Sequence, residues 1–457
     1  MRNLWFVAFL TLLPAADWGR FRGPNGSGVG SGTGLPVEFG PGKNVAWKAA
    51  VPFGRSSPVV AGGRVFLTAS EAGTLLTLAY DLKTGKELWR RGVKPSGLKP
   101  IYKANDAASP TPAVDENSVY VFFQDFGLIA YSLAGKERWR APMGPFTNFY
   151  GIGSSPVVAN GLVVMLCDQI KGSFVVAVDT ATGKVRWRRE RPEAVDGWSV
   201  PVVYLDQLIL VGSARVDSYQ LATGEGRWWY PLMSNGAMGS PVIHGDTLVV
   251  TASGSDTPWM PSFGATLAKV DKNGDGLISS AEAAGEQDWY EHFGWVDADG
   301  NQLLTEKEWE TARQFGVGEY EAVAIPLGGK GKLENAAIRW RLKRNLPYVP
   351  SALLYEGVFY MVKSGGIVTS VDPATGAILK QGRSTGALGE YHSSPVAGDG
   401  KIYAANVEGK MAVLQAGAQW ELLRVNDLED EVFATPAIVE GGLIVRTRGA
   451  LYRFGGR

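Results

Sequence analysis

The sequence predicts an all-β protein folded as an eight-bladed β-propeller that is closed by its N-terminal strand. Three observations support this fold. A short phrase centred on a proline recurs eight times, a tryptophan follows a Thr-Gly turn in several repeats, and an unpaired strand near the N-terminus matches a missing strand at the C-terminus. At 457 residues the chain exceeds the usual size of a single domain, so a repeat array accounts for its length.

The first repeated phrase consists of an apolar strand, a polar or glycine turn and a second apolar strand. It reads "SSPVVAGGRVFL" from residue 56, "SSPVVANGLVVM" from 154 and "SSPVAGDGKIYA" from 393. Short apolar runs bounded by turn residues predict β-hairpins. The central position of the phrase, here called the pivot, is occupied in the eight repeats by Pro58, Pro112, Pro156, Pro201, Pro241, Ala352, Pro395 and Pro436.

The second repeated phrase is another pair of strands that ends in tryptophan. It reads "AYDLKTGKELW" to Trp89, "AVDTATGKVRW" to Trp187 and "SYQLATGEGRW" to Trp228, with a shorter form ending at Trp139. Four short strands every 40 to 45 residues are typical of propeller blades. We expect the tryptophan rings to fill the gaps between adjacent blades. Trp340 and Trp420 occupy the same place more loosely, and Lys380 replaces the tryptophan in one repeat.

The two ends of the chain complete one blade. The last repeat stops after "ALYRF" with three strands, whereas "NVAWKAAVP" at 44–52 is a single strand with Trp47 at the closing position. Pairing these segments would close the ring and remove exposed sheet edges. The propeller is therefore predicted to cover residues 44–457, preceded by a glycine-rich leader at 17–43.

The N-terminal residues have the pattern of a secretory signal. A short basic start is followed by the apolar run Leu4 to Leu13 and by Pro14-Ala15-Ala16, which predicts a signal peptide at residues 1–16. The apolar run is too short to cross a bilayer comfortably. Because the formal net charge is +0, we expect no nucleic-acid partner. The single cysteine excludes an internal disulfide. We predict a periplasmic or secreted protein without a membrane span.

A loop with the pattern of a calcium site interrupts the fifth repeat. The segment "DKNGDGLISSAE" lies between two strands of that repeat, "LVVTAS" and "YEAVAIPL". Oxygen donors at alternate positions let one tight loop wrap around a hard cation, and Gly276 supplies the bend. The predicted ligands are Asp271, Asn273, Asp275, the Leu277 carbonyl, Ser279 through water, and bidentate Glu282.

A second loop, "DADGNQLLTEKE", follows. Its predicted ligands are Asp297, Asp299, Asn301, the Leu303 carbonyl, Thr305 and Glu308. Gln302 stands where glycine is expected, and the left-handed conformation costs a side chain about 1–2 kcal/mol, so weaker binding is expected here. Ile278 and Leu304 occupy the positions at which paired loops meet. The two loops predict an EF-hand pair at residues 256–316 that holds structural calcium. The alternative is a pair of surface turns without metal.

Strand parity places this insert beside the propeller axis. In a four-stranded antiparallel blade, the turn between the second and third strands lies at the same end as the link to the next blade. The insert therefore shares a face with all inter-blade links. These links carry residues that would meet at the axis and could form a pocket for a protein or small-molecule ligand: Asp106, Tyr150, Trp198, Asn235, Tyr348, Glu390 and His392. The alternative is that these loops are polar only because loops are exposed.

The repeats resemble those of pyrroloquinoline-quinone-like propeller proteins, the superfamily of quinoprotein alcohol dehydrogenases and of the outer-membrane assembly protein BamB. The two repeated phrases and "WGRFRGPNGSGV" at 18–29 carry the resemblance. In this superfamily, members that hold the quinone typically have adjacent cysteines and often a haem segment, whereas Cys167 stands alone. We therefore predict an exported calcium-binding propeller that acts as a non-catalytic binding or assembly scaffold. The alternatives are a dehydrogenase with pyrroloquinoline quinone as cofactor and a BamB-like outer-membrane protein assembly factor.

Overall fold

The computed structural model describes residues 18–95, 97–98, 101, 105–146, 148, 150–232, 238–255, 257–286, 289–297, 300–314 and 317–456. The predicted signal peptide at 1–16 lies outside the described residues, as do Asn235 and Asp299.

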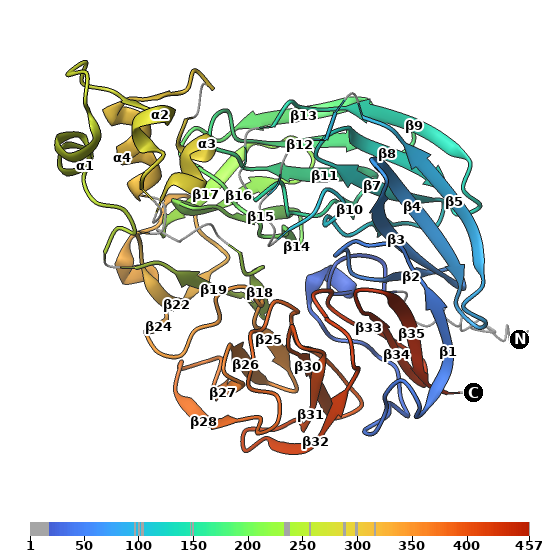
Figure 1. The fold of residues 1–457 in the computed structure, drawn as a ribbon. Coiled ribbons are helices and arrows are strands. Elements are labelled where there is room, and N and C mark those ends of the chain that lie inside the picture. Colours follow the sequence, from blue (N-terminus) through green and yellow to red (C-terminus); the bar gives the residue numbers. More distant parts are fainter. Residues whose placement is uncertain are drawn as a thin grey trace, which may run out of the picture.

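Eight antiparallel sheets surround a central axis, so the predicted eight-bladed propeller is confirmed (Figure 1). Blade 1 contains β2 (Val59–Ala61), β3 (Arg64–Glu71), β4 (Thr74–Asp81) and β5 (Glu87–Val93). Blade 2 contains β6 (Ala113–Val114), β7 (Ser118–Phe123), β8 (Gly127–Ser132) and β9 (Glu137–Pro142). Blade 3 contains β10 (Val157–Ala159), β11 (Leu162–Cys167), β12 (Phe174–Asp179) and β13 (Val185–Glu190). Blade 4 contains β14 (Val202–Tyr204), β15 (Gln207–Val211), β16 (Arg215–Gln220) and β17 (Gly226–Pro231).

The remaining blades follow the same order from the axis outward. Blade 5 contains β18 (Val242–His244), β19 (Thr247–Ser253), β22 (Tyr320–Pro326) and β24 (Trp340–Leu342). Blade 6 contains β25 (Leu353–Tyr355), β26 (Val358–Lys363), β27 (Ile367–Val371) and β28 (Ile378–Arg383). Blade 7 contains β29 (Val396–Gly398), β30 (Lys401–Ala405), β31 (Lys410–Gln415) and β32 (Glu421–Asp427). Blade 8 contains β33 (Ala437–Val439), β34 (Gly442–Arg446), β35 (Ala450–Gly455) and the N-terminal β1 (Val45–Ala50).

Closure by the N-terminal strand is also confirmed. β1 pairs antiparallel with β35, and this pairing places Val45 opposite Phe454 and Ala50 opposite Ala450. One further strand, β23 (Gly331–Lys332), pairs in parallel with the outer edge of β17 and widens blade 4 to five strands. The short 3-10 helix η3 (Asn335–Ala337) follows β23 and precedes β24.

The burial of each strand follows from its place in the blade. All six residues of β7 and of β11 are buried, because both faces of these inner strands pack against neighbouring blades. In the outer strand β5, only Trp89 is buried. The apolar runs therefore mark second and third strands, whereas the single tryptophan marks a fourth strand whose other side chains reach solvent.

The repeated tryptophans dock onto the glycine turn between the third and fourth strands of the next blade. The indole N–H of Trp89 donates to the carbonyl of Leu133 at 3.0 Å, and its ring covers Gly135, where a Cβ atom would lie 2.7 Å from the ring. Glycine is thus required beneath the ring. The same arrangement joins Trp47 to Gly85, Trp139 to Gly183, Trp187 to Gly224 and Trp340 to Gly376.

Three repeats depart from this arrangement, those with Trp228, Lys380 and Trp420 at the closing position; Trp420 lies against Gly382 of the preceding blade. Trp228 donates instead to the side chain of Gln207 in its own blade at 3.0 Å. In blade 6, the ammonium group of Lys380 donates to the carbonyl of Trp420 at 2.6 Å and lies 4.7 Å from the centre of its ring. Trp340 docks in the same way as the regular tryptophans, although its repeat was expected to fit the pattern only loosely.

The leader crosses the axis and packs against the innermost strands. The Val60 N–H donates to the Trp18 carbonyl at 3.0 Å, and the Val114 N–H donates to the Gly19 carbonyl at 2.8 Å. Farther along, the Ala397 N–H donates to the Gly28 carbonyl at 2.8 Å. The 3-10 helix η1 (Pro24–Gly26) lies between these contacts. The leader therefore links blades 1, 2 and 7 across the axis.

A helical insert lies between β19 and β22 and projects from blade 5 (Figure 1). Its elements are α1 (Phe263–Val270), β20 (Ile278–Ser279), α2 (Ser280–Ala283), η2 (Tyr290–His292), α3 (Phe293–Val296), β21 (Leu303–Leu304) and α4 (Glu306–Gln314). The insert has its own apolar core, which includes Phe263, Trp289 and Trp309. Among the described residues, none of the helices is long and apolar enough to cross a membrane.

Candidate functional site

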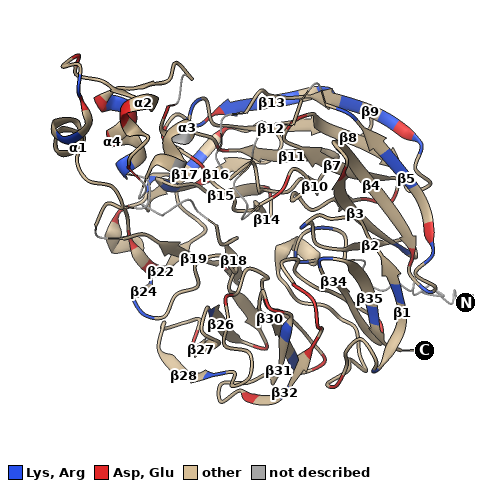
Figure 2. Cartoon of the chain, in the orientation of Figure 1, with Lys and Arg blue, Asp and Glu red and all other residues tan. Residues whose placement is uncertain are grey.

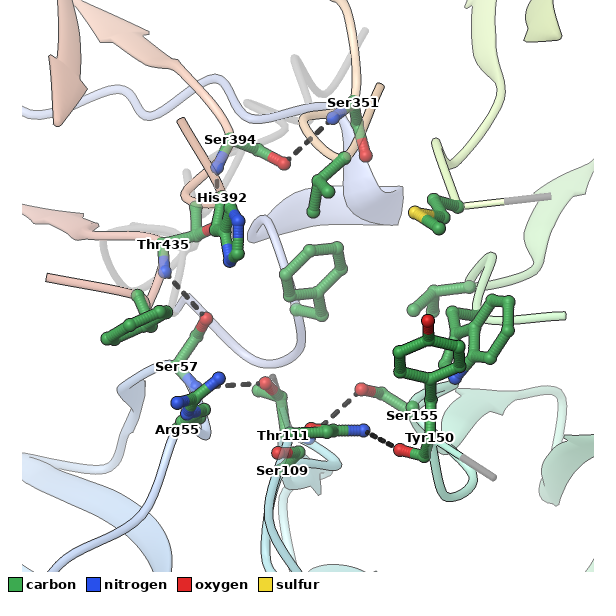
Figure 3. Close-up of a pocket in the computed structure, with 18 of the residues that line it drawn as sticks. Arg55, Ser57, Ser109, Thr111, Tyr150, Ser155, Ser351, His392, Ser394 and Thr435 are labelled. Atoms are coloured by element: carbon green, nitrogen blue, oxygen red, sulfur yellow. Dashed lines mark hydrogen bonds between the residues drawn. The ribbon is translucent and has the colours of Figure 1, made fainter. Parts of the chain in front are cut away.

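The inter-blade links enclose a cavity of about 680 Å³ at one end of the axis, here called the axial pocket (Figure 3). The end of the propeller that carries these links is the pocket face. The aromatic lining consists of Phe21, Tyr150, Trp198, Tyr348 and Phe433. The hydroxyl groups come from Ser57, Ser109, Thr111, Ser155, Ser351, Ser394 and Thr435. The charged or titratable groups are Arg55, Glu390 and His392.

A ring of hydrogen bonds between blades surrounds the pocket. At seven of the eight blades, the residue before the pivot donates its backbone N–H to the side-chain hydroxyl at the same position of the next blade, over 2.9–3.1 Å. Seven of the eight positions carry a hydroxyl: Ser57, Thr111, Ser155, Ser240, Ser351, Ser394 and Thr435. Val200 at the eighth position has none, so the ring is interrupted between blades 3 and 4. Each ring hydroxyl accepts one bond and keeps its own O–H as a donor.

Two walls of the pocket differ in chemistry. On one side, Tyr150 and Trp198 pack edge to face with ring centres 5.6 Å apart, and the Trp198 indole N–H donates to the Gly151 carbonyl at 2.8 Å. On the other side, the Arg55 guanidinium lies 3.9 Å from the centre of the Phe433 ring. An aromatic wall thus faces a wall that carries a cation.

Burial shifts the pKa of two groups, His392 and Arg55, on the wall that carries the cation. It lowers the pKa of His392, an effect opposed by Glu390, whose carboxylate lies 3.8 Å from the imidazole, and reinforced by Arg55. Burial also lowers the pKa of Arg55. The pocket therefore favours a neutral imidazole beside a guanidinium group that is half withdrawn from solvent.

The leader forms the floor of the pocket with Phe21. On either side of Phe21, the guanidinium groups of Arg20 and Arg22 are buried and donate to the carbonyls of Pro201 and Ala352. Burial lowers the pKa of Arg20 to about 10; burial together with Arg20 lowers that of Arg22 to about 9. The two arginines anchor the leader to blades 4 and 6, because both acceptors are pivot residues.

The residues predicted for the axial site fall into three groups. Five of them line the pocket together: Tyr150, Trp198, Tyr348, Glu390 and His392. Asp106 does not line it; its carboxylate accepts from the Ala108 N–H at 2.7 Å and the Ser109 hydroxyl at 3.0 Å, which shapes the link between blades 1 and 2. Asn235 lies outside the described residues. Phe21, Arg55 and Phe433 were not predicted from the sequence.

A buried ionic network lies between blades 3 and 4, next to Trp198. The Arg191 guanidinium contacts the Asp168 carboxylate at 2.8 and 3.2 Å and the Asp217 carboxylate at 2.8 Å. Asp217 also contacts Arg215 at 2.7 Å. Burial raises the pKa of Asp168 and of Asp217, while Arg191 opposes the rise in both. No short motif predicts this network, because Asp168 and Arg191 follow strands of blade 3 whereas Asp217 lies in β16 of blade 4.

The first loop of the insert has the geometry of a tight turn around Asp271. Its carboxylate accepts from the N–H groups of Gly274 at 2.7 Å and Gly276 at 3.1 Å. At the other end, the Glu282 carboxylate accepts from the Ser279 N–H at 2.9 Å and the Ser279 hydroxyl at 2.6 Å. These bonds and one from the Lys272 N–H lower the pKa of Glu282 to about 2.

The second loop repeats this arrangement. Asp297 accepts from the Gly300 N–H at 2.9 Å, and Glu308 accepts from the Thr305 N–H at 2.9 Å. Gln302 adopts φ of 66°, the left-handed conformation expected at that position. β20 and β21 join the loops, with Ile278 opposite Leu304. Among the described residues, no three His, Cys, Asp or Glu side chains gather as a group that could hold a metal ion.

Comparison with known proteins identifies the family. The family model described as "Outer membrane protein assembly factor BamB" matches residues 28–166, 78–266, 171–294 and 330–454, which together cover most of the chain. The chain belongs to this BamB family. The resemblance inferred from the repeated phrases is thereby confirmed.

Among curated proteins, BamB from Burkholderia pseudomallei (strain K96243) is 27% identical over 194 residues, which are 42% of this chain and 47% of that protein. Quinohemoprotein alcohol dehydrogenase ADH IIB from Pseudomonas putida is 32% identical over 115 residues, 24% of this chain and 17% of that protein. The chain thus spans less than half the length of each of these relatives.

Solved structures show the same fold at low identity. BamB from Moraxella catarrhalis has a TM-score of 0.59 and 10% identity, covering 90% of this chain and 99% of that one. A europium-containing methanol dehydrogenase has a TM-score of 0.62 and 12% identity, covering 97% and 98%. An assembly factor and a dehydrogenase therefore share this fold, and the fold does not separate their functions.

Proposed function

We propose that the protein is an exported, calcium-binding β-propeller that acts as a non-catalytic binding or assembly scaffold, with its ligand or partner bound at the pocket face. The distribution of exposed apolar side chains carries this proposal. Among the described residues, seven of the eleven large apolar side chains that reach solvent belong to inter-blade links, the insert or its base, all on the pocket face: Phe53, Leu98, Trp259, Tyr290, Tyr320, Tyr348 and Leu388. An excess of exposed apolar side chains on one face favours binding of a partner there.

The polar lining supports the same proposal. Six of the pocket hydroxyls belong to the hydrogen-bonded ring that joins the blades, so they hold the ring together as well as facing a ligand. An aromatic floor, an aromatic wall and surplus O–H donors suit a ligand that presents an apolar group together with hydrogen-bond acceptors. This arrangement binds and orients a ligand without requiring a chemical step.

Calcium binding is the second part of the proposal. The oxygen-bearing residues of both loops recur at the spacing that hard cations require, and the β20–β21 pair joins the loops as in a two-site module. Calcium would draw the carboxylates of Asp271 and Glu282 together and stabilise the insert. Calorimetric titration of the whole chain should show two sites, with the tighter one lost in Glu282→Gln and the weaker one lost in Glu308→Gln. Titration heats unchanged in both variants would contradict calcium binding by these loops.

Site-specific photocross-linking tests the binding face. A photoreactive phenylalanine at Tyr348, which is 49% exposed at the pocket, should give discrete protein adducts when the protein is exported in a Gram-negative host. The matched control is the same group at Leu205, which is 78% exposed in the β14–β15 turn at the opposite end. Adducts from Leu205 but none from Tyr348 would exclude the pocket face. Adducts with the outer-membrane assembly machinery would favour the BamB-like role that the family description suggests.

A quinone-dependent dehydrogenase is the competing candidate. It is favoured by the position of the aromatic pocket on the axis and by the local similarity to a quinohemoprotein alcohol dehydrogenase. Purified protein mixed with pyrroloquinoline quinone and calcium should neither acquire the quinone absorbance nor reduce an artificial electron acceptor when alcohols or sugars are added. Saturable quinone binding with substrate-dependent dye reduction would replace the scaffold proposal with the dehydrogenase.

A further inference from the structure

We infer that calcium binding in the insert fixes the aromatic wall of the axial pocket, through the loop at residues 168–173 of blade 3. This inference rests on the proposed calcium binding and concerns the regulation of the proposed pocket. Its basis is an unbroken set of contacts from the paired loops of the insert to Trp198.

The first contact joins the insert to a distant blade. The loop at 168–173 connects β11 to β12, and Ile170 within it packs against the apolar core of the insert. That core contains Ile278 and Leu304, both fully buried, which are the residues that pair the two predicted calcium loops. The insert leaves blade 5 and therefore rests on blade 3, beyond blade 4.

The second contact joins the same loop to the link between blades 3 and 4. The Ser173 hydroxyl donates to the Ala194 carbonyl at 2.8 Å, and the Arg191 N–H donates to the Ser173 carbonyl at 2.8 Å. At the start of the loop, buried Asp168 accepts two bonds from the Arg191 guanidinium. The loop and the link are thus held as one unit by buried polar bonds, which are costly to break singly.

The third contact reaches the pocket wall. A Cβ atom on Gly197 would lie 3.2 Å from Asp168 Oδ2, so the link runs directly against that carboxylate. The next residue is Trp198, which lines the pocket and packs against Tyr150. A shift of Asp168 therefore moves the backbone that carries the pocket wall.

Calcium can act through these contacts because it binds the ordered form of the insert more tightly than a disordered one. In the calcium-bound protein, the β20–β21 pair and the apolar core hold Ile170. Without calcium the core loosens, Ile170 loses its contact, and the loop at 168–173 opens more often. The pocket wall then loses its fixed position.

Hydrogen exchange of the whole chain tests this inference, with calcium or with a chelator. Calcium should slow exchange at least tenfold in peptides covering 168–173 and 194–198, as well as in the insert loops. Ile170→Ser should abolish the effect on 168–173 and 194–198 while leaving the insert loops protected. The matched control Leu205→Ser, in the exposed turn at the opposite end of blade 4, should preserve both effects. The single cysteine, buried Cys167 next to Asp168, provides a second readout, since calcium should slow its alkylation at least tenfold.

The outcomes separate this inference from the proposal on which it rests. Protection of the insert loops by calcium without protection of 168–173 would overturn the coupling and leave calcium binding intact. Protection of neither region would overturn calcium binding and the coupling together. The comparison of the unmodified protein with and without calcium decides the matter even if Ile170→Ser fails to fold.

Discussion

The propeller ring and the insert are stabilised in different ways. The ring repeats the same two devices from blade to blade: a tryptophan on a glycine turn, and a hydroxyl that accepts a backbone N–H near the axis. Among its described residues, the insert has a core of eleven buried apolar side chains, and its helices are as short as the four residues of α2 and α3. So small a unit rarely folds on apolar burial alone. We therefore expect the ring to be stable on its own, whereas the insert would need the proposed calcium.

Charged side chains lie along the outer edge of the ring. Figure 2 shows Lys and Arg concentrated along β5, β9 and β13, the outer strands of the first three blades. Many of these cations pair with nearby carboxylates, as Arg140 does with Glu137 at 2.6 Å. Such exposed pairs contribute little to stability. The internal contacts of the ring, rather than its charged edge, are therefore the place to test its stability.

The largest effect is expected from removing one docked tryptophan. Trp139 is buried against Gly183 of the next blade and donates to the Thr180 carbonyl at 2.8 Å. Trp139→Ala should cost about 3–5 kcal/mol in the free energy of unfolding, with or without calcium, as measured by urea denaturation. Val185→Ala on the neighbouring strand β13, 59% exposed, serves as the control and should change little. A loss that disappears when calcium is added would show that the ring is not self-sufficient.

The glycine under that tryptophan should be nearly as sensitive. A Cβ atom on Gly183 would lie 2.6 Å from the Trp139 ring, whereas one on Gly161 would meet no atom within 4 Å. Both glycines have positive φ, of 68° and 75°. Gly183→Ala should therefore cost about 1–3 kcal/mol more than Gly161→Ala, since only the first overpacks the contact. If urea denaturation showed that both variants lose the same free energy of unfolding, glycine would be required at position 183 only for its backbone conformation.

A stabilising change is expected at the gap in the hydroxyl ring. Val200 occupies the only ring position without a hydroxyl, next to Ser155 of blade 3. Val200→Thr keeps the shape and adds the missing acceptor, so it should raise the free energy of unfolding by about 0.5–1.5 kcal/mol. Ser155→Ala, which removes the acceptor of the Thr111 N–H, should lower it. Destabilisation by Val200→Thr would show that the interruption is required.

The smallest effect concerns pH. Burial lowers the pKa of His392 in the folded protein, so the unfolded chain takes up a proton more readily. The stability that this residue contributes is fully present above the unfolded pKa of about 6.5. It is lost as the pH falls through the lower folded pKa. His392→Gln should therefore lose less stability than the unmodified protein between pH 8 and pH 5, measured by urea denaturation. An equal loss in both proteins would contradict this.

The blades could be predicted from sequence because each is encoded locally. Pro58 and Trp89 mark the same places as their counterparts elsewhere, and Trp47 revealed the strand that closes the ring. The hydroxyl ring also had a visible signal, a serine or threonine before nearly every pivot. The role of these hydroxyls could not be inferred from the sequence, because each one contacts a different blade. The Ser57 hydroxyl, for example, accepts from the Thr435 N–H of blade 8.

The axial site was only partly predictable for a related reason. The parity of the strands in each blade and the polar residues of the inter-blade links identified the segments that bring Tyr150, Trp198 and His392 into one pocket. Phe21 was missed because nothing local indicates that the leader crosses the axis. The Arg191 network was missed because Asp168 and Asp217 lie on two different blades, and ion pairs between blades leave no periodic pattern.

A crystal structure of the full chain grown with calcium tests the central claim most directly, that a calcium module stands on the pocket face of a self-sufficient ring. We predict anomalous calcium peaks about 2.3–2.6 Å from the side-chain oxygens of Asp271, Asn273, Asp275 and Glu282, with Ile170 packed against the insert. A well-ordered insert without calcium in either loop at saturating concentration, or calcium bound only elsewhere, would contradict the account.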